Sequence, residues 1–181
     1  MNYITFGLYD IISAMGEEKA LAILSSFKCS LNPDAEKFLK KVSIRHEKNG
    51  ISKTYLIFDG NPTDAHNLKG YFTLGVKCFV VNEGREIPKD TLTKMNVNRG
   101  VAQAYLLGQI AKADGTERGF GKTMIFHALK IFYRGYKMFG CRTIRLDCKD
   151  EPRLINYYES LGFISVGKNH DNALNQMVVI M

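Results

Sequence analysis

Between an apolar, strand-like run and an amphipathic helical pattern stands the stretch Ala113-Asp114-Gly115-Thr116-Glu117-Arg118-Gly119-Phe120-Gly121-Lys122-Thr123. Gly119 and Gly121 lie one residue apart, so the backbone there can approach a ligand closely. The first amides of a helix have no partner inside the helix, and they point at any anion placed before it. The stretch therefore predicts a phosphate-binding turn. Taken alone it stays ambiguous, because glycine before a helix can also be plain turn chemistry.

The length and composition of the chain restrict its class. With 181 residues, of which 45% are hydrophobic, it is long enough for one well-buried core and short for two ordinary domains. We therefore predict a single domain over residues 1–181. No run approaches the ~20 apolar residues of a membrane span, and residues 1–10 lack the basic start and long apolar run of a signal peptide. These features predict a cytoplasmic protein that does not meet a membrane.

The four cysteines are spread along the chain without a CxxC pair, at Cys29, Cys78, Cys141 and Cys148. This spacing indicates neither a zinc site nor a disulfide framework. We therefore expect no metal, and we expect most of the four to be buried thiols.

The charge of the chain is basic and uneven. It carries 25 Lys or Arg and 18 Asp or Glu, a net charge of +7. Residues 112–153 hold ten of the basic and five of the acidic residues, an excess of five in the region of the glycine turn. This excess suits a polyphosphate ligand or a nucleic acid. A solvated basic face is the alternative.

Periodicity and turn signals predict a series of strands and helices. Asn32-Pro33-Asp34 is a helix start, because Asn can cap the helix and Pro suits its first position. The polar stretch 82–100 is long for a plain connection and is predicted to be a functional loop. We expect helices at 11–27, 33–47, 122–138 and 151–161, and strands at 3–8, 54–59, 70–81, 105–113, 143–148, 163–166 and 176–181, the second and third forming a hairpin. This order implies an α/β or α+β sheet with helices packed on it.

Four polar side chains lie off the apolar stripe of the 122–138 helix and are predicted to be solvated: His127, Lys130, Arg134 and Lys137. His46 falls on the apolar face of the 33–47 helix, where we expect a boundary histidine rather than a catalytic one.

A P-loop nucleotide hydrolase is one interpretation of the turn, because Gly121-Lys122-Thr123 matches the end of GxxxxGK[ST] and Asp147 ends a strand as a metal-binding aspartate does. The first glycine of that motif would fall at Thr116, however, and Arg145 interrupts the apolar strand before Asp147. Only 58 residues follow Thr123, which is little room for the parallel sheet of such enzymes. The P-loop interpretation is therefore disfavoured.

A second motif follows about 40 residues later, Tyr157-Tyr158-Glu159-Ser160-Leu161-Gly162-Phe163. Together the two motifs resemble the GNAT family of N-acetyltransferases. In that family a strand ends in a (Gln/Arg)-x-x-Gly-x-(Gly/Ala) loop that takes the acyl-CoA pyrophosphate, and a later helix carries an aromatic-Tyr-x-x-x-Gly-Phe ending. The resemblance covers roughly Tyr55 to the C-terminus.

The resemblance implies an α/β (α+β) fold of the GNAT type. Its central sheet is mixed and largely antiparallel, splayed between the fourth and fifth core strands, with flanking helices. It also implies an enzyme that transfers an acyl group, most simply acetyl, from acetyl-CoA directly to a primary amine. The acceptor is left open among a small molecule, a protein and an aminoacyl-tRNA, and a homodimer is left open too. A module that binds CoA without turnover is the alternative from another class.

The resemblance also implies roles for particular residues. Tyr158 matches the acid that protonates the leaving thiolate. Backbone amides near Ile110, Ala111 and Lys112 would polarise the thioester carbonyl. The pyrophosphate would lie on Thr116, Glu117, Arg118, Gly119, Phe120, Gly121, Lys122 and Thr123.

This chain departs from the family pattern at two positions. Thr116 stands at the Gln/Arg position of the loop, so Arg118 or Lys122 would rebuild part of the phosphate contact. Leu154 stands where a small residue is usual, four positions before Tyr158.

The N-terminal half resembles that of bacterial toxin acetyltransferases, which acetylate the amino group of aminoacyl-tRNA. The resemblance rests on Phe27-Lys28-Cys29-Ser30-Leu31-Asn32, Phe38-Leu39, Ser52-Lys53-Thr54-Tyr55 and Gly70-Tyr71-Phe72-Thr73-Leu74. The basic surface suits such a substrate, because neutralising phosphates supplies much of nucleic-acid affinity.

No single residue is identified as the general base. Asp114, Glu117 and Asp147 stand near the predicted site in sequence, and each of them can instead cap a helix or pair with a cation. Cys148 lacks an evident His partner, so we expect a core thiol there rather than a covalent acyl carrier.

Overall fold

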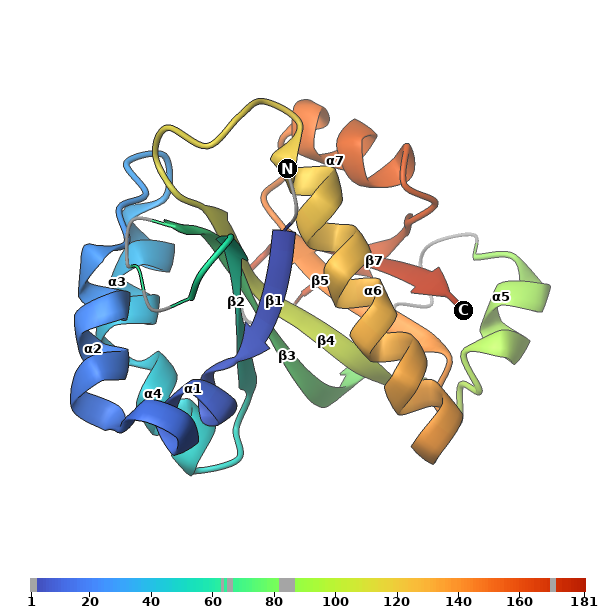
Figure 1. The fold of residues 1–181 in the computed structure, drawn as a ribbon. Coiled ribbons are helices and arrows are strands. Elements are labelled where there is room, and N and C mark those ends of the chain that lie inside the picture. Colours follow the sequence, from blue (N-terminus) through green and yellow to red (C-terminus); the bar gives the residue numbers. More distant parts are fainter. Residues whose placement is uncertain (1–2, 63, 65–66, 82–86, 170–171) are drawn as a thin grey trace. The chain divides into compact units, whose positions relative to one another are not determined.

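The computed structural model describes residues 3–62, 64, 67–81, 87–169 and 172–181 (Figure 1). The chain divides into two compact units. Unit 1 comprises residues 1–75 and 109–130, and unit 2 comprises residues 76–108 and 131–181. The single domain expected from the length therefore stays a prediction.

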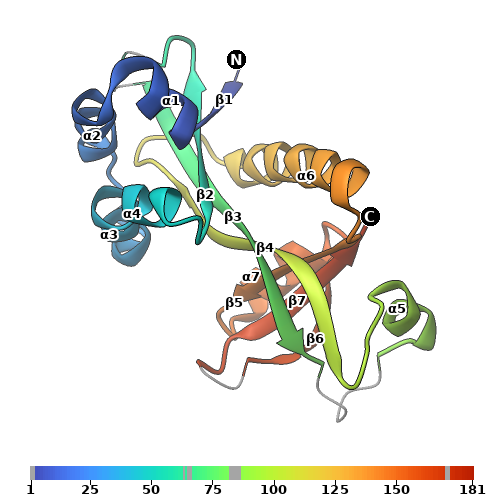
Figure 2. The same cartoon turned by 90° about the horizontal axis from the view of Figure 1, so that it is seen from below.

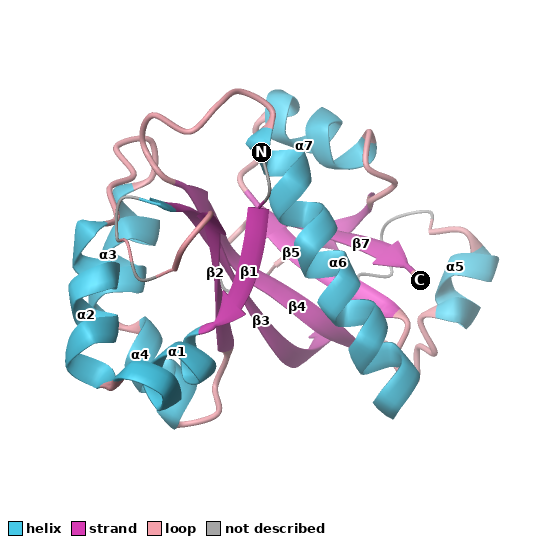
Figure 3. Ribbon diagram, viewed as in Figure 1, coloured by secondary structure: helices cyan, strands magenta, loops and turns pink. Residues whose placement is uncertain are grey.

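In the described part of the chain, seven strands form the sheet, in the order β1-β2-β3-β4-β5-β7-β6. Figure 3 draws the strands in magenta. The strands are β1 Tyr3–Gly7, β2 Lys53–Asp59, β3 Leu68–Val80, β4 Val101–Lys112, β5 Thr143–Cys148, β6 Ile164–Lys168 and β7 Asn175–Ile180. The pairs β1–β2, β2–β3, β5–β7 and β6–β7 are antiparallel, whereas β4 and β5 are parallel. The predicted mixed, largely antiparallel sheet is confirmed.

The ladder between β4 and β5 is short. It joins residues 105–107 of β4 to residues 144–146 of β5, although β4 continues to Lys112 and β5 to Cys148. The two strands thus stop pairing partway along their length. This is the predicted splay between the fourth and fifth core strands, and it leaves the end of β4 without a β5 ladder.

Seven helices accompany the strands in the described part of the chain. They are α1 Leu8–Met15, α2 Glu17–Ser26, α3 Pro33–Lys41, α4 Ser43–Lys48, α5 Lys89–Lys94, α6 Phe120–Phe139 and α7 Pro152–Glu159. Asn32 caps α3 as predicted, because its side-chain oxygen accepts from the Ala35 amide at 3.1 Å. The exposed Lys130, Arg134 and Lys137 on α6 also agree with the prediction.

Two predicted N-terminal helices are each broken into two. The 11–27 helix begins earlier and is interrupted at Gly16, which has φ +86° and ψ 159°. This conformation is essentially restricted to glycine, and the Gly16 amide closes α1 on the Ile12 carbonyl at 2.9 Å. The 33–47 helix is interrupted at Val42, whose φ is −119°. Periodicity did not reveal either break, since the apolar positions stay in phase across it.

Unit 1 has its core between the N-terminal helices and strands β2 and β3. In Figure 2 the helices α1–α4 gather beside β2, and α1 and α4 pack against that strand. Leu24, Leu39, Leu56 and Tyr71 are fully buried. The Tyr71 hydroxyl donates to the Ala35 carbonyl at 2.6 Å, so even its polar atom is satisfied in the core.

Unit 2 has a separate core that includes Phe79, Met95, Val166 and Val178. The six-residue helix α5 lies within the stretch predicted to be a loop, and Met95 after it is buried, so that prediction was wrong for residues 89–94. The rest of the predicted loop includes residues 82–86, which lie outside the described residues. The C-terminal strand pair is present as β6 and β7.

Two predictions about single side chains hold only in part. Cys29 and Cys148 are buried, but Cys78 is exposed and Cys141 is half-buried. His127 is half-buried rather than solvated, because its Nδ1 lies 2.6 Å from the Thr5 hydroxyl on β1. His46 is at the boundary as expected, edge-on to Phe38.

The break at Gly16 gives a prediction about stability. Gly16→Ala should lower the free energy of unfolding by about 1–3 kcal/mol, the cost of a strained backbone conformation. Packing contributes little to this cost, since a Cβ at Gly16 meets no atom within 4 Å. Urea unfolding measures the change, and Ser13→Ala on the exposed side of α1 is the control, with an expected change under ~0.5 kcal/mol. A Gly16→Ala protein as stable as the control would contradict the role of the φ angle.

Candidate functional site

The glycine turn occupies residues 113–119, between the end of β4 and the start of α6. Gly115 and Gly119 have φ angles of +76° and +92°, in the left-handed region that favours glycine. A Cβ at either position would meet no atom within 4 Å. The two glycines are therefore required by backbone conformation, and the space beside each of them is open.

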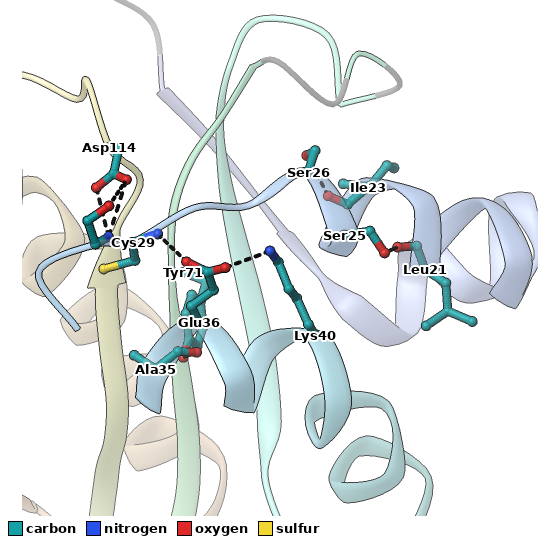
Figure 4. Close-up of polar contacts among 11 residues, drawn as sticks. Leu21, Ile23, Ser25, Ser26, Cys29, Ala35, Glu36, Lys40, Tyr71 and Asp114 are labelled. Carbon is teal, nitrogen blue, oxygen red and sulfur yellow. Dashed lines mark hydrogen bonds and ion pairs between the residues drawn. The ribbon is translucent and has the colours of Figure 1, made fainter. Parts of the chain in front are cut away.

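The first anchor of the turn is Asp114. Its amide donates to the Lys28 carbonyl at 2.8 Å. Its carboxylate accepts from the Ser30 amide at 3.0 Å and from the Ser30 hydroxyl at 2.7 Å, and Figure 4 marks hydrogen bonds at the labelled Asp114 carboxylate. The hydrogen bonds from Ser30 lower the pKa of the Asp114 carboxyl. Asp114 thus ties the turn to the loop between α2 and α3, and a carboxylate held in this way is a poor general base.

The second anchor is Thr116, with Lys112 beside it. The buried Thr116 hydroxyl donates to the Lys69 carbonyl at 3.1 Å. The Lys112 ammonium donates to the carbonyls of Thr116 at 2.8 Å and Glu117 at 3.2 Å. Thr116, which replaces the Gln/Arg of the family pattern, therefore stabilises the turn through its own side chain. The Lys112 ammonium also stabilises the turn, by binding two of its carbonyls.

The third anchor joins the turn to β1. The Tyr3 hydroxyl donates to the Glu117 carboxylate, and the Tyr3 ring lies edge-on to the buried Phe120 with centroids 4.8 Å apart. The hydrogen bond from Tyr3 lowers the pKa of the Glu117 carboxyl. Burial, and then the Glu117 carboxylate, raise the pKa of the Tyr3 phenol to about 12. The two groups therefore remain a neutral donor and an ionised acceptor across the ordinary pH range.

Several groups of the turn remain available to a ligand. The side chains of Arg118 and Lys122 are exposed. The amides of Phe120 and Gly121 open α6, where helix geometry provides no acceptor within the helix. A cluster of cationic side chains and helix-start amides is an anion-binding arrangement.

The end of β4 offers further amides on one edge. The Gln109 amide donates to the Thr73 hydroxyl at 2.7 Å and the Ala113 amide donates to the Lys69 carbonyl at 2.8 Å, so both face β3. Amides of successive strand residues alternate between the two edges, so those of Ile110 and Lys112 face the other edge, where the parallel ladder has ended. Ala111 has its side chain buried in the core of unit 1. Thr123, in the first turn of α6, is half-buried.

Tyr158 belongs to unit 2, on the last turn of α7. It is 8% exposed, and its ring packs against Tyr157 and Phe163 at centroid distances of 5.2 and 5.8 Å. Its carbonyl accepts the amides of Leu161 and Phe163, which closes the turn at Gly162, where φ is +88°. Burial, and to a lesser degree the neighbouring Cys148 and Tyr157, raise the pKa of the Tyr158 phenol to about 12. The group is a proton donor at neutral pH and not a base.

The other candidate groups of unit 2 serve the structure. The Asp147 carboxylate makes two hydrogen bonds to the buried Arg145 guanidinium, at 2.6 and 2.8 Å, and accepts from Asn169 at 3.0 Å. Arg145 also stacks over the Phe79 ring, which explains how a charge is accommodated in β5. Burial, and then nearby acidic charges, raise the pKa of the Cys148 thiol, which lies 3.6 Å from the Met177 sulfur. A neutral buried thiol fits a core role and not an acyl carrier.

No role in the turn was predicted for Tyr3, or for Ser30, which contributes only to the N-terminal resemblance, although both residues fix the turn. They lie 114 and 84 residues from their partners, so no local pattern marks them. Among the described residues no group of three His, Cys, Asp or Glu side chains is placed to hold a metal ion. In that same part of the chain, no helix has the length and apolar character to cross a membrane.

The Asp114 anchor gives a prediction about pH dependence. Because its pKa is lower in the folded protein, the ionised carboxylate stabilises the fold above the usual value of 3.8, and this contribution is lost as the pH falls through the folded pKa. Wild type should therefore melt at a higher temperature than Asp114→Ala near neutral pH, and the difference should vanish in acid. Ser30→Ala should lower the melting temperature near neutral pH by part of the amount seen for Asp114→Ala. Asp90→Ala, which breaks an exposed ion pair, should change the melting temperature little at any pH. A gap between wild type and Asp114→Ala that is independent of pH would contradict the assignment.

No protein-family model and no curated protein matches the sequence. The fold, in contrast, is similar to solved structures over nearly the whole chain. AtaT complexed with acetyl-methionyl-tRNAfMet matches with a TM-score of 0.72 and 21% identity, covering 96% of this chain and 94% of that one.

Two further structures agree with this match. A tyrosine-to-phenylalanine mutant of KacT matches with a TM-score of 0.74 and 19% identity, covering 99% of this chain and 95% of that one. A tyrosine-to-phenylalanine mutant of the AtaT toxin, bound to the C-terminus of the antitoxin AtaR and acetyl-CoA, matches with a TM-score of 0.63 and 20% identity, covering 87% and 84%. The chain therefore shares the fold of AtaT and KacT over nearly its full length, in agreement with the GNAT-type fold predicted from the two motifs.

Proposed function

We propose that this protein is an acetyl-CoA-dependent N-acetyltransferase that acts on the amino group of an aminoacyl-tRNA. The observation that carries the proposal is the turn after β4. It combines two glycines in the left-handed region, helix-start amides and the exposed Arg118 and Lys122, and it is fixed by three anchors that leave those groups available. Such a turn fits the diphosphate of CoA.

The residues of the turn divide into two groups in this proposal. Gly119, Phe120, Gly121 and Thr123 present backbone or hydroxyl donors, and Arg118 and Lys122 add positive charge. Thr116 and Glu117 shape the turn through their anchors, and Lys112 contributes its amide while its ammonium is engaged inside. Side-chain contact from the position of Thr116 is thus replaced by a backbone cradle that is organised before the ligand arrives.

The chemistry of acetyl transfer requires three further things of the protein. The thioester carbonyl must be polarised, and the open amides of Ile110 and Lys112 are suited to this. The attacking amine must be neutral when its nitrogen bonds to the carbonyl carbon. The sulfur that leaves must gain a proton, and the Tyr158 phenol is suited to donate it because its pKa of about 12 keeps it protonated.

The choice of an aminoacyl-tRNA as acceptor has two supports. AtaT, whose fold this chain shares over nearly its full length, was solved with an acetylated aminoacyl-tRNA. The chain also carries a net charge of +7. The broader expectation was a primary amine on an unassigned acceptor, and the similarity to AtaT favours the narrower one.

A basic hollow in unit 1 offers a place for RNA phosphates. It has a volume of about 320 Å³ and is lined by Glu17, Leu21, Lys40, Lys41, Ile44, Arg45, Lys48 and Asn49. Lys40 pairs with Glu36 at 2.7 Å and Lys48 pairs with Glu17 at 2.5 Å. Lys41 and Arg45 make no ion pair with any described residue, so both are available to phosphates.

The role of Tyr158 as a general acid is tested by comparing Tyr158→Phe with Tyr157→Phe. Tyr158→Phe should lower turnover by about 10²- to 10⁴-fold, the usual contribution of a positioned acid, while the Kd for CoA stays within about twofold of wild type. Tyr157→Phe is the matched control, because the Tyr157 hydroxyl is buried without a hydrogen-bond partner among the described residues. Its removal should leave turnover unchanged and should not reduce stability.

Release of the CoA thiol from acetyl-CoA, with calorimetric CoA binding alongside, measures both effects. Unchanged turnover in Tyr158→Phe would remove this residue from the acid role. If wild type never releases thiol with any amine although CoA raises its melting temperature, the protein is a CoA-binding module instead.

The acceptor is tested with RNA. Purified protein, acetyl-CoA and a mixture of aminoacyl-tRNAs should yield acetylated aminoacyl ends, detected by mass spectrometry. Lys41→Ala/Arg45→Ala should weaken tRNA binding and reduce the salt slope by about 1–2, one per lost phosphate contact. Lys89→Ala, an exposed lysine of α5 in unit 2, is the control. Unmodified tRNA, together with normal growth of bacteria that express the protein, would refute this acceptor.

A further inference from the structure

The carboxylate of Glu117 stands inside a turn that is suited to an anion. It lies three residues before Phe120, and it accepts a hydrogen bond from the Tyr3 hydroxyl. Its pKa is lowered, so it stays ionised. An acidic side chain at the start of a helix is attracted to the free amides there, as a phosphate is. Glu117 is thus a potential internal competitor for the donors of the turn.

Tyr3 is placed to prevent this competition. Its hydroxyl binds the Glu117 carboxylate from the side of β1, and its ring is fixed against Phe120. Residues 3–7 of β1 pair along their length with β2, with Tyr3 opposite Asp59, so the phenol is held by the sheet and does not depend on the turn for its position. The donor that restrains Glu117 is therefore anchored outside the segment that it controls.

We propose that Tyr3 is a positioning residue for the diphosphate-binding turn: it holds the Glu117 carboxylate away from the amides at the start of α6, so that these amides remain free for the diphosphate of CoA. This inference rests on the proposed function, and it adds Tyr3, which lies 114 residues before Glu117 in the sequence, to the residues that prepare the CoA site. Tyr3 touches neither the reacting thioester nor the amine in this role. Its removal should therefore change the affinity for the nucleotide part of CoA and leave the chemical step alone.

The experiment begins with Tyr3→Phe, which keeps the ring against Phe120 and removes only the hydroxyl. The Kd for CoA and the KM for acetyl-CoA should rise about three- to tenfold, the usual effect of one ordinary hydrogen bond, with kcat at saturation unchanged. Acetyl-pantetheine, which lacks the diphosphate, should be used equally well by wild type and Tyr3→Phe. A defect that is equal for both donors would overturn the proposal.

The decisive variant is Tyr3→Phe/Glu117→Gln. Glutamine has nearly the shape of glutamate but no charge, so it competes weakly for the amides, and the Kd for CoA should recover most of the loss. The remaining difference from wild type is the lost anchor to β1. A merely structural role of the Tyr3 hydroxyl predicts no such rescue. A double variant as weak as Tyr3→Phe would therefore overturn the inference.

If Tyr3→Phe does not fold, the Kd for CoA of the single variant Glu117→Gln tests the proposal instead. This variant should bind CoA at least as tightly as wild type, because the glutamine amide oxygen can still accept from the Tyr3 hydroxyl and keep the anchor while the competing charge is gone. Weaker binding would contradict the proposal. Failure of wild type itself to bind CoA would instead refute the proposed function, so the two failures are distinguishable.

Discussion

In the proposed function, the turn between β4 and α6 is subject to one constraint: backbone amides that are to receive an anion cannot be satisfied within the fold. A segment that keeps its own donors free cannot hold itself in place with them. The structure meets this constraint with side chains and with carbonyls of other segments. Asp114 reaches the loop between α2 and α3, Thr116 reaches the start of β3, and Glu117 reaches β1. Three separate parts of unit 1 thus fix one turn from outside.

The anchors are effective because the segments they reach are themselves fixed. In the loop that receives Asp114, the Cys29 amide donates to Glu36 at 2.7 Å, and Glu36 also accepts from Lys40 (Figure 4). Beneath this loop the buried Phe27 packs edge-on to Tyr71, with centroids 5.4 Å apart. The helices of the N-terminal half therefore provide a rigid frame for the turn, beyond covering the sheet.

The sequence predicted those features that depend on neighbouring residues. The cap at Asn32, the β2–β3 hairpin and the glycine turn all carry local signals, and the structure contains each of them. Gly16 was missed because a glycine inside a continuous apolar pattern can be tolerated by a helix or can break it, and only tertiary packing decides.

The anchors of the turn depend on contacts between distant parts of the chain, which local sequence patterns do not predict. Asp114 and Glu117 were visible as acids near a predicted site, and general-base catalysis was one natural role for each. Their partners, Ser30 and Tyr3, are distant in the sequence, so only the fold could show that both carboxylates are engaged. Asp147 differs, since its partner Arg145 lies two residues away, on the same face of the strand predicted over 143–148, so this pair was open to prediction from the sequence.

This engagement of the acids bears on the acceptor. A tyrosine whose pKa is about 12 donates a proton but does not remove one at neutral pH, and the three candidate carboxylates are each held by other groups. An amine that is already neutral needs least help from the protein. At a pH of about 7.5, about a third of an α-amino group is neutral, against about one in a thousand of a lysine ammonium. A protonated phenol without a free carboxylate base among these three therefore suits the proposed acceptor, the α-amine of an aminoacyl ester, better than a lysine side chain.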